Sequence, residues 1–270
     1  MTSERRRPTL IGLPYDASSS FQRGAADAPP LIRAALASPA SNAWSELGIE
    51  TGGVTALADA GDLELPPTGA ARTMIEAGVR RVLDQDGRPI ALGGDHSVTY
   101  PILRAIRPGW PDLTIVHLDA HPDLYPEFDG DPFSHACPFA RIMEERLTDR
   151  LVQVGIRTMN EMQRIEAERH GVEVIDMPAW AGGQRPHIRG PVYVSVDIDV
   201  LDPAFAPGVS HREPGGLSVR EVLTLLQSLP SPVVGADIVE FNPTQDPSGL
   251  TASVCAKLVK ELAGHMLAGN

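Results

Sequence analysis

Short apolar runs alternate along this chain with longer segments whose apolar residues recur at the period of a helix. The runs are rich in Val, Ile and Leu, as expected for strands that are covered on both faces. This alternation predicts an α/β fold with a mostly parallel sheet. The predicted strands span residues 9–13, 89–92, 113–118, 151–154, 172–175, 192–196 and 233–238. The predicted helices span residues 70–84, 139–147, 161–169, 219–229 and 252–267.

The organisation of the chain indicates one folding unit. No internal repeat and no break in composition divides it, so we expect a single domain over residues 1–270. Ser218, followed three residues later by Glu221, has the pattern of a capping box, which predicts that a helix begins there. Two stretches, residues 123–138 and 201–217, are long for simple connections, and long loops in compact domains are often functional.

Charge and cysteine content exclude several classes of protein. Lys and Arg number 23 against 35 Asp and Glu, a net charge of −12, and this acid excess argues against a nucleic-acid partner. No run approaches the ~18 apolar residues of a membrane span, and no apolar segment follows the arginines near the N-terminus as in a secretory signal. The sequence has two cysteines, Cys137 and Cys255, so no disulfide framework is expected. We therefore expect a cytoplasmic protein without nucleic-acid or membrane partners.

Four of the predicted strands run directly into acidic residues or histidines. Because the carboxyl ends of parallel strands meet at one edge of a sheet, where ligands bind, we expect these side chains to converge on one crevice. Residues two apart share a face of an extended chain, so alternate residues in each motif can point the same way. The residues at these strand ends are Asp95, His96, Asp119, His121, Asp123, Asp197, Asp199 and Glu240.

The chemistry of this set favours divalent metal ions. Four carboxylates brought together repel one another at neutral pH unless they are protonated or bridged by cations. Two imidazoles with four carboxylates suit Mn²⁺, and less specifically Fe²⁺, Co²⁺ or Zn²⁺. Two divalent ions balance four Asp charges, which favours a two-metal hydrolytic site over a one-metal site. The predicted ligands are His96, Asp119, His121, Asp123, Asp197 and Asp199.

Simpler interpretations exist for each motif taken alone. An Asp-x-Asp pair is most often a solvated turn. Gly93-Gly94 could be a tight turn or a phosphate cradle, although no P-loop lysine or Rossmann spacing follows it. Three such elements behind three strands are hard to explain as coincidence, so the metal site is the better interpretation.

At these residues the chain resembles the ureohydrolase superfamily, which contains arginases, agmatinases and their relatives. The resemblance extends over nearly the whole chain, and two further segments, residues 28–33 and 134–143, are most similar to plant-type arginases and their bacterial relatives. The motifs that carry it are Gly93-Gly94-Asp95-His96-Ser97, Asp119-Ala120-His121-Pro122-Asp123, Ser195-Val196-Asp197-Ile198-Asp199, residues 202–208 and residues 237–243.

The resemblance implies a three-layer α/β/α fold with an eight-stranded, mostly parallel sheet, and assembly as a homotrimer or homohexamer. It also implies two Mn²⁺ ions per subunit. One ion would take His96, Asp119, Asp123 and Asp197. The other would take Asp119, His121, Asp197 and Asp199, so that Asp119 and Asp197 bridge.

The reaction that the resemblance implies is hydrolysis of a guanidino group to urea and an amine by water that the ion pair activates. Glu240 would pair with the guanidinium, because a planar cation matches a carboxylate in a fork geometry. His135 would carry a proton to the departing amine, since imidazole titrates near neutral pH. Cys137 could suggest a nucleophile, but this chemistry already has one.

The substrate is the point on which the sequence says least. Asn160 stands where animal arginases place an Asp that helps hold the substrate α-amino group, and plant-type arginases share the Asn. The resemblance therefore implies that Asn160 binds the substrate. L-arginine, converted to L-ornithine and urea, is therefore the first choice. Agmatine, converted to putrescine and urea, is the alternative, because residues 125–134 contain three acids and no Lys or Arg for an α-carboxylate. Another guanidino acid is a further option.

Two interpretations outside the ureohydrolases fit the sequence less well. A metal-binding relative without catalysis is disfavoured by the complete ligand set with Glu240, and a one-zinc deacetylase lacks the paired Asp pattern. Of the other histidines, we expect His117 to have a core role, with a position beside the ligands as the alternative. We expect His211 at the surface.

Overall fold

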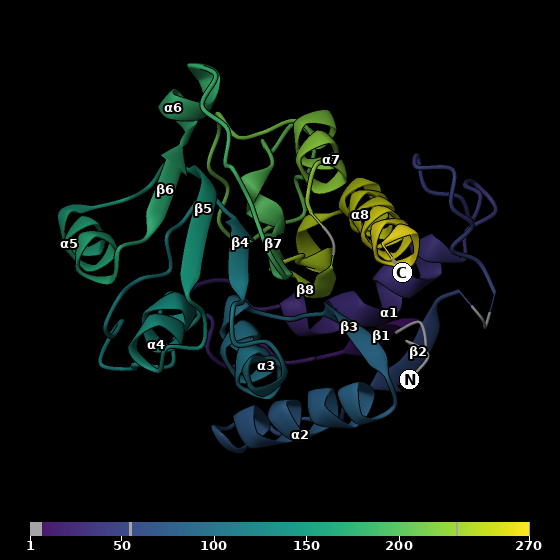
Figure 1. Ribbon diagram of the computed structural model, residues 1–270, viewed down its shortest axis with the longest axis horizontal. Coiled ribbons are helices and arrows are strands. Elements are labelled where there is room, and N and C mark those ends of the chain that lie inside the picture. The colour runs from purple at the N-terminus through teal and green to yellow at the C-terminus, as the bar shows by residue number, and fades with distance from the viewer. Residues whose placement is uncertain (1–6, 54–55, 231, 270) are drawn as a thin grey trace.

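A computed structural model describes residues 7–53, 56–230 and 232–269 (Figure 1). Within this part of the chain, eight strands form one sheet in the order β2-β1-β3-β8-β7-β4-β5-β6, and all neighbouring strands are parallel. The predicted fold class is confirmed. The strands are β1 (Arg7–Gly12), β2 (Ala58–Asp62), β3 (Gly87–Leu92), β4 (Thr114–Leu118), β5 (Arg150–Ile156), β6 (Glu173–Asp176), β7 (Val192–Asp197) and β8 (Val233–Val239).

Helices cover both faces of the sheet and give three layers (Figure 1). Two separate apolar clusters, one on each side of the sheet, show which helices belong to which face. One face carries α2 (Ala70–Asp84), α3 (Thr99–Ile106), α4 (Pro138–Glu144) and α5 (Glu161–His170). The other carries α1 (Ala28–Leu36), α6 (Met177–Ala181), α7 (Val219–Gln227) and α8 (Leu250–Ala268). Among the described residues, no helix is both long and apolar enough to cross a membrane.

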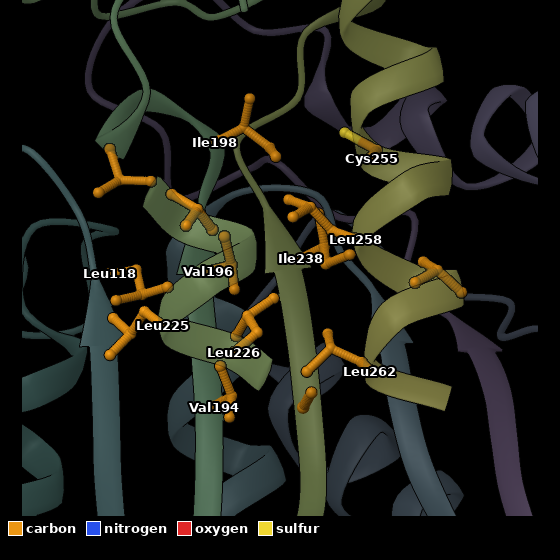
Figure 2. Close-up of a cluster of buried hydrophobic side chains, with 14 of the residues drawn as sticks. Leu118, Val194, Val196, Ile198, Leu225, Leu226, Ile238, Cys255, Leu258 and Leu262 are labelled. Carbon is orange, nitrogen blue, oxygen red and sulfur yellow. The ribbon is translucent and has the colours of Figure 1, made fainter. Parts of the chain in front are cut away.

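The core beside the central strands explains how the strand ends are held. Figure 2 shows side chains from β4, β7 and β8 packed against α7 and α8. Leu118, Val196 and Ile198 are fully buried in this cluster, and each stands next to one of the predicted ligands in the sequence. Burying such side chains is worth about 1.5–3 kcal/mol each. The alternating apolar residues therefore anchor the segments that present the carboxylates.

Most predicted elements are present, and the differences have physical causes. The apolar pattern of the sequence did not predict β2. This strand lies at the exposed edge of the sheet, and its sequence, Ala-Asp-Ala-Gly-Asp, has low strand propensity. The pattern also missed α1 and α3, because both are short and contain proline near their first turn. The capping box at α7 is confirmed, since the Ser218 hydroxyl accepts from the Glu221 amide at 3.2 Å and the Glu221 carboxylate accepts from the Ser218 amide at 2.9 Å.

The predicted metal ligands and Glu240 follow the four central strands, β3, β8, β7 and β4. Beside them the chain makes one close approach that requires glycine. The Asp95 amide donates to the Tyr15 carbonyl at 2.9 Å, and a Cβ on Gly94 would lie 1.8 Å from the same oxygen. This contact brings the segment after β1 alongside the carboxyl end of β3.

Candidate active site

Four of the predicted ligands form a first cluster at the ends of β3, β4 and β7. His96 begins the short 3₁₀ helix η2 (His96–Val98), and Asp119 and Asp197 stand at the ends of their strands. The His96 Nδ1 atom lies 3.1 Å from an Asp119 oxygen, 3.1 Å from an Asp123 oxygen and 3.2 Å from an Asp197 oxygen. This is the set predicted for one metal ion.

A second cluster shares Asp119 with the first. The His121 Nδ1 atom lies 3.4 Å from Asp119 Oδ1 and 3.0 Å from Asp199 Oδ2. Asp197, the fourth residue predicted for the second ion, accepts from the Asp199 amide at 2.9 Å, where the chain turns into η4 (Ile198–Val200). The two oxygens of Asp119 therefore face different clusters.

The chemistry of the first cluster tests whether these residues fit a metal. The His96 Nδ1 atom is buried among three carboxylate oxygens and makes no hydrogen bond among the described residues. Burial, together with the charges of Asp199 and Asp119, raises the pKa of Asp197 well above its usual range. A divalent cation removes both problems, because it accepts the imidazole lone pair and neutralises the carboxylates. The residues fit a divalent metal.

His135 and Glu240 form a buried pair next to the clusters. The His135 Nδ1 atom lies 2.8 Å from Glu240 Oε1, which also accepts from the His96 amide at 2.8 Å. The Ser20 amide donates to His135 Nε2 at 3.1 Å, which places the ring proton on Nδ1, facing Glu240. Burial lowers the pKa of His135, but the Glu240 carboxylate outweighs it and raises the pKa to about 9.

Two of the acids at the site have a backbone conformation that residues other than glycine rarely adopt. Asp123 has φ = 50° and Glu240 has φ = 62°. Strain of this kind costs roughly 1–3 kcal/mol per residue and concentrates at functional sites, where the surrounding structure must hold it. The Glu240 amide donates to the Gly94 carbonyl at 2.8 Å. The strained conformation is thus fixed by the neighbouring strand end.

A pocket of about 270 Å³ opens above the two clusters. His135 and Glu240 line it with Asp197 and Asp199, and side chains from several loops line it farther out. No Lys or Arg is found among the described residues that line this pocket. The pocket is therefore acidic and suits a cationic group such as a guanidinium.

Asn160 lies just outside this pocket and has a structural role. Its side-chain oxygen accepts from the Gln163 amide at 3.0 Å, and its side-chain nitrogen donates to the Tyr125 hydroxyl at 2.6 Å. Asn160 is the N-cap of α5, whereas Tyr125 and Gln163 line the pocket. Arg157, a cation three residues before Asn160 in the sequence, donates to the carbonyls of Asp199 and Glu213, each at 2.6 Å.

Two residues at the site were missed by sequence reasoning. His211, expected at the surface, is half-buried and lines the pocket, with its ring centroid 5.7 Å from that of His121 and 5.4 Å from that of His135. The expectation was wrong because the length of the 201–217 loop, the one available signal, does not say where the loop folds. Asn242, fully buried, donates to the Arg23 carbonyl at 3.2 Å and the Ser210 hydroxyl at 2.9 Å. It fastens two loops beside the pocket.

Cys137 takes no part in this arrangement. Its side chain is buried, and burial raises the pKa of its thiol to about 12. A thiol that stays protonated at neutral pH is a poor nucleophile. The expectation that Cys137 is not catalytic agrees with these surroundings.

Comparison with known proteins gives a consistent family. The sequence matches the Arginase family over residues 6–264. "Arginase 1, mitochondrial" of Arabidopsis thaliana is 46% identical over 277 residues, covering 96% of this chain and 80% of that protein. The agmatinase of Bacillus cereus is 34% identical, covering 96% and 91%. The solved structure of an arginase from Medicago truncatula has a TM-score of 0.91 at 40% identity, covering 97% and 88%. The resemblance to plant-type arginases is confirmed.

The expectation of a cytoplasmic protein is wrong. Four of the similar plant arginases are named as mitochondrial, or as chloroplastic and mitochondrial, and not as cytoplasmic proteins. The sequence criteria tested only for secretion and for disulfides, and neither criterion separates the cytoplasm from an organelle.

Proposed function

The chain belongs to the arginase family, and from this membership we propose that its substrate is L-arginine, which it hydrolyses to L-ornithine and urea. It is a hydrolase that acts on guanidino groups. Plant arginases at 42–46% identity are more similar to it than the agmatinases at 34%. This difference supports arginine over agmatine.

We propose that the site holds two Mn²⁺ ions per subunit. The observation that carries this proposal is that two His/Asp clusters share Asp119 at the bottom of one acidic pocket. His96, Asp119, Asp123 and Asp197 would hold one ion, and Asp119, His121, Asp197 and Asp199 the other. When bound, such a pair supplies Lewis acidity and lowers the pKa of water toward neutral pH.

Glu240 would bind and orient the guanidinium. Its Oε1 atom already accepts from the His96 amide and faces His135, so the carboxylate is held before substrate arrives. A preformed carboxylate can accept two N–H bonds from a planar guanidinium, which fixes the orientation of the group as well as its position. Glu240 would thereby direct the guanidinium carbon toward the two clusters.

His135 would hold and deliver the proton that the departing amine needs. Glu240 favours the protonated imidazole, as the raised pKa of His135 indicates. The proton would leave from Nδ1, which faces Glu240, because Nε2 accepts a hydrogen bond from the Ser20 amide. A cationic substrate that binds Glu240 competes with the His135 ring for the same carboxylate, so substrate binding would favour release of this proton.

One observation favours agmatine as the second candidate. The described part of the pocket lining contains no Lys or Arg, and Arg157 is fully occupied by backbone carbonyls. An α-carboxylate would therefore depend on neutral donors at the outer part of the pocket, such as the Tyr125 hydroxyl and the Gln163 amide. Agmatine has no carboxylate and needs none of these groups.

The test is urea release by Mn²⁺-loaded protein with arginine, agmatine, guanidinobutyrate and guanidinopropionate. We expect arginine to have the highest kcat/KM, and two bound Mn²⁺ per chain by elemental analysis. A higher kcat/KM for agmatine than for arginine would show that agmatine is the preferred substrate, and the proposed reaction class would still hold. One ion per chain, or none, would contradict the two-metal proposal. Ultracentrifugation of the same sample tests the homotrimer or homohexamer that the family resemblance implies.

A further inference from the structure

Gln153 is a buried residue of β5 that has no role in the proposed reaction. It stands directly opposite His117 in the register between β4 and β5, and both side chains are fully buried. Its amide nitrogen lies 2.6 Å from the carbonyl of Pro122 and 3.0 Å from the Nδ1 atom of His117. Pro122 lies between two proposed ligands, His121 and Asp123.

The orientation of this amide is determined by its surroundings. If it were turned over, its oxygen would face the Pro122 carbonyl oxygen at about the same separation, and two acceptors repel. In the observed orientation the Gln153 oxygen is buried and has no hydrogen-bond partner among the described residues. The side chain therefore leaves its acceptor unused while both hydrogens of its nitrogen are engaged.

The orientation of the amide in turn locates the proton of His117. Because Gln153 donates to Nδ1, that atom must accept, and the ring proton is on Nε2. The Nε2 atom lies 2.7 Å from Asp119 Oδ2 and donates to it. Phe139 stacks on the same ring, with 3.8 Å between centroids. His117 is therefore a donor to Asp119, although its position beside His96 and Asp119 would also suit a metal ligand.

Two donors thus hold Asp119, one on each oxygen. His117 donates to Oδ2, which faces the first cluster, and the His121 amide donates to Oδ1 at 2.6 Å, which faces the second. Asp119 is the residue that the two clusters share. Asp123, at the other end of the segment, has its backbone in the strained left-handed region and follows the carbonyl that Gln153 holds.

We infer that Gln153 is a positioning residue of the metal site. One hydrogen of its amide fixes the His117 tautomer that orients Asp119, and the other fixes the backbone between His121 and Asp123. The inference rests on the proposed function, since it concerns the ligands of the proposed ions. Outer partners of metal ligands are typically worth about 10–100-fold in metal affinity.

The experiment compares Mn²⁺ affinity in the unaltered protein, Gln153→Glu, Gln153→Leu and Thr148→Val, measured from free Mn²⁺ by electron paramagnetic resonance. A glutamate has the shape of glutamine but can donate at most one hydrogen bond, so it cannot serve both the Pro122 carbonyl and the His117 ring. Leucine can donate none. Thr148→Val is the matched control. The buried Thr148 hydroxyl donates to the Leu113 carbonyl at 2.7 Å, and this bond joins the segments that precede β5 and β4, at the opposite end of the strands from the site.

We expect both Gln153 variants to bind Mn²⁺ at least about tenfold more weakly, with Thr148→Val within twofold of the unaltered protein. Gln153→Glu binding within twofold of the unaltered protein, or an equal loss in Thr148→Val, would overturn the inference. If the unaltered protein itself binds no Mn²⁺, the proposed function fails first, so the two failures are distinguishable.

A second measurement needs no variant at residue 153. Long-range ¹H–¹⁵N spectra of the metal-free protein report which imidazole nitrogen carries the proton, and the signal that disappears in His117→Gln belongs to His117. We expect the Nε2–H tautomer. A proton on Nδ1 would contradict the inference even if the Gln153 variants failed to fold.

Discussion

The floor and the rim of the pocket are built differently. We call the proposed ligands, at residues 96, 119–123 and 197–199, the floor, and the loops at residues 17–24, 125–135, 157–163 and 205–213 the rim. Floor side chains directly follow strands of the central sheet, whose apolar neighbours are buried. Rim loops are held by hydrogen bonds between segments far apart in the chain, such as Ser20 to His135 and Asn242 to Arg23.

This difference separates the chemistry from the choice of substrate. The floor is fixed by a parallel sheet, so every guanidino substrate meets the same carboxylates and histidines. The rim is fixed by a few polar contacts, so its shape can change without altering the floor. Changes in the floor should therefore affect all substrates equally, and changes in the rim should discriminate between them.

The largest effect is expected for Asp197→Ala, in the floor. Metal content should fall below two ions per chain, and urea release should fall about 10³-fold with arginine and agmatine alike, because a Lewis acid contributes several kcal/mol to the transition state. Elemental analysis and urea assays measure both quantities. Asp149→Ala, which removes an exposed acid paired with Arg107, is the control. Normal turnover with two bound ions would contradict the assignment of the floor.

Glu240→Gln should have the next largest effect. The amide keeps the shape but loses the charge that attracts a guanidinium, so kcat/KM should fall about 10²-fold, and equally for both substrates, while two ions stay bound. Glu166→Gln is the control, at a buried acid of α5 beside Arg169. It should leave kcat/KM unchanged for both substrates. A loss confined to arginine would place Glu240 in the rim and contradict its proposed role.

Asn160→Asp changes the rim. Aspartate caps a helix as well as asparagine does, so α5 keeps its N-cap, but the donor to Tyr125 is lost and a negative charge is added. We expect KM for arginine to rise about tenfold and KM for agmatine to change less than twofold, because only arginine carries an α-carboxylate. The reverse exchange at the N-cap of α6, Asp176→Asn, is the control. Equal effects on both substrates would contradict a role for this part of the rim in selection.

The smallest effect is a pH dependence of stability where floor and rim meet. The pKa of His135 is raised from 6.5 to about 9 in the folded protein. A raised pKa stabilises the fold below the unfolded value and loses that contribution as pH rises through 9. In metal-free protein, we expect His135→Gln to lower the free energy of unfolding by on the order of 1–3 kcal/mol at pH 6 and by almost nothing at pH 10. Thermal melts across this range test it, and a constant difference would contradict the ion pair with Glu240.

The sequence predicts the floor better than the rim for a physical reason. Buried parallel strands have continuous apolar runs, and a polar residue at the end of such a run marks the carboxyl edge of the sheet, as at Asp119 and Asp197. The same logic located Glu240 after β8. Gln153 could not be found in this way, because its importance comes from facing His117 across two strands, and pairing is not visible in one sequence.

The rim could not be predicted because its contacts are non-local. The loop that carries His211 places its ring near those of His121 and His135. The path of this loop depends on hydrogen bonds from Asn242 and Arg157, and no local sequence pattern encodes these contacts. The resemblance implies that Asn160 binds the substrate, yet its side chain caps α5 and contacts Tyr125. The exposed edge strand β2 was missed for the opposite reason, since a short polar strand has no periodicity to detect.

The Asn242 side chain has a consequence for engineering. It holds residues 23 and 210 together, and a Cβ on Gly24 would lie 2.3 Å from its oxygen, so the two loops share one fixed point. Grafting either loop alone from a relative with another specificity would leave the graft constrained by the loop that stayed behind. Residues 17–24 and 205–213 should therefore be exchanged together, as one unit. A library that varies both loops at once samples pocket shapes that a library of one loop does not reach.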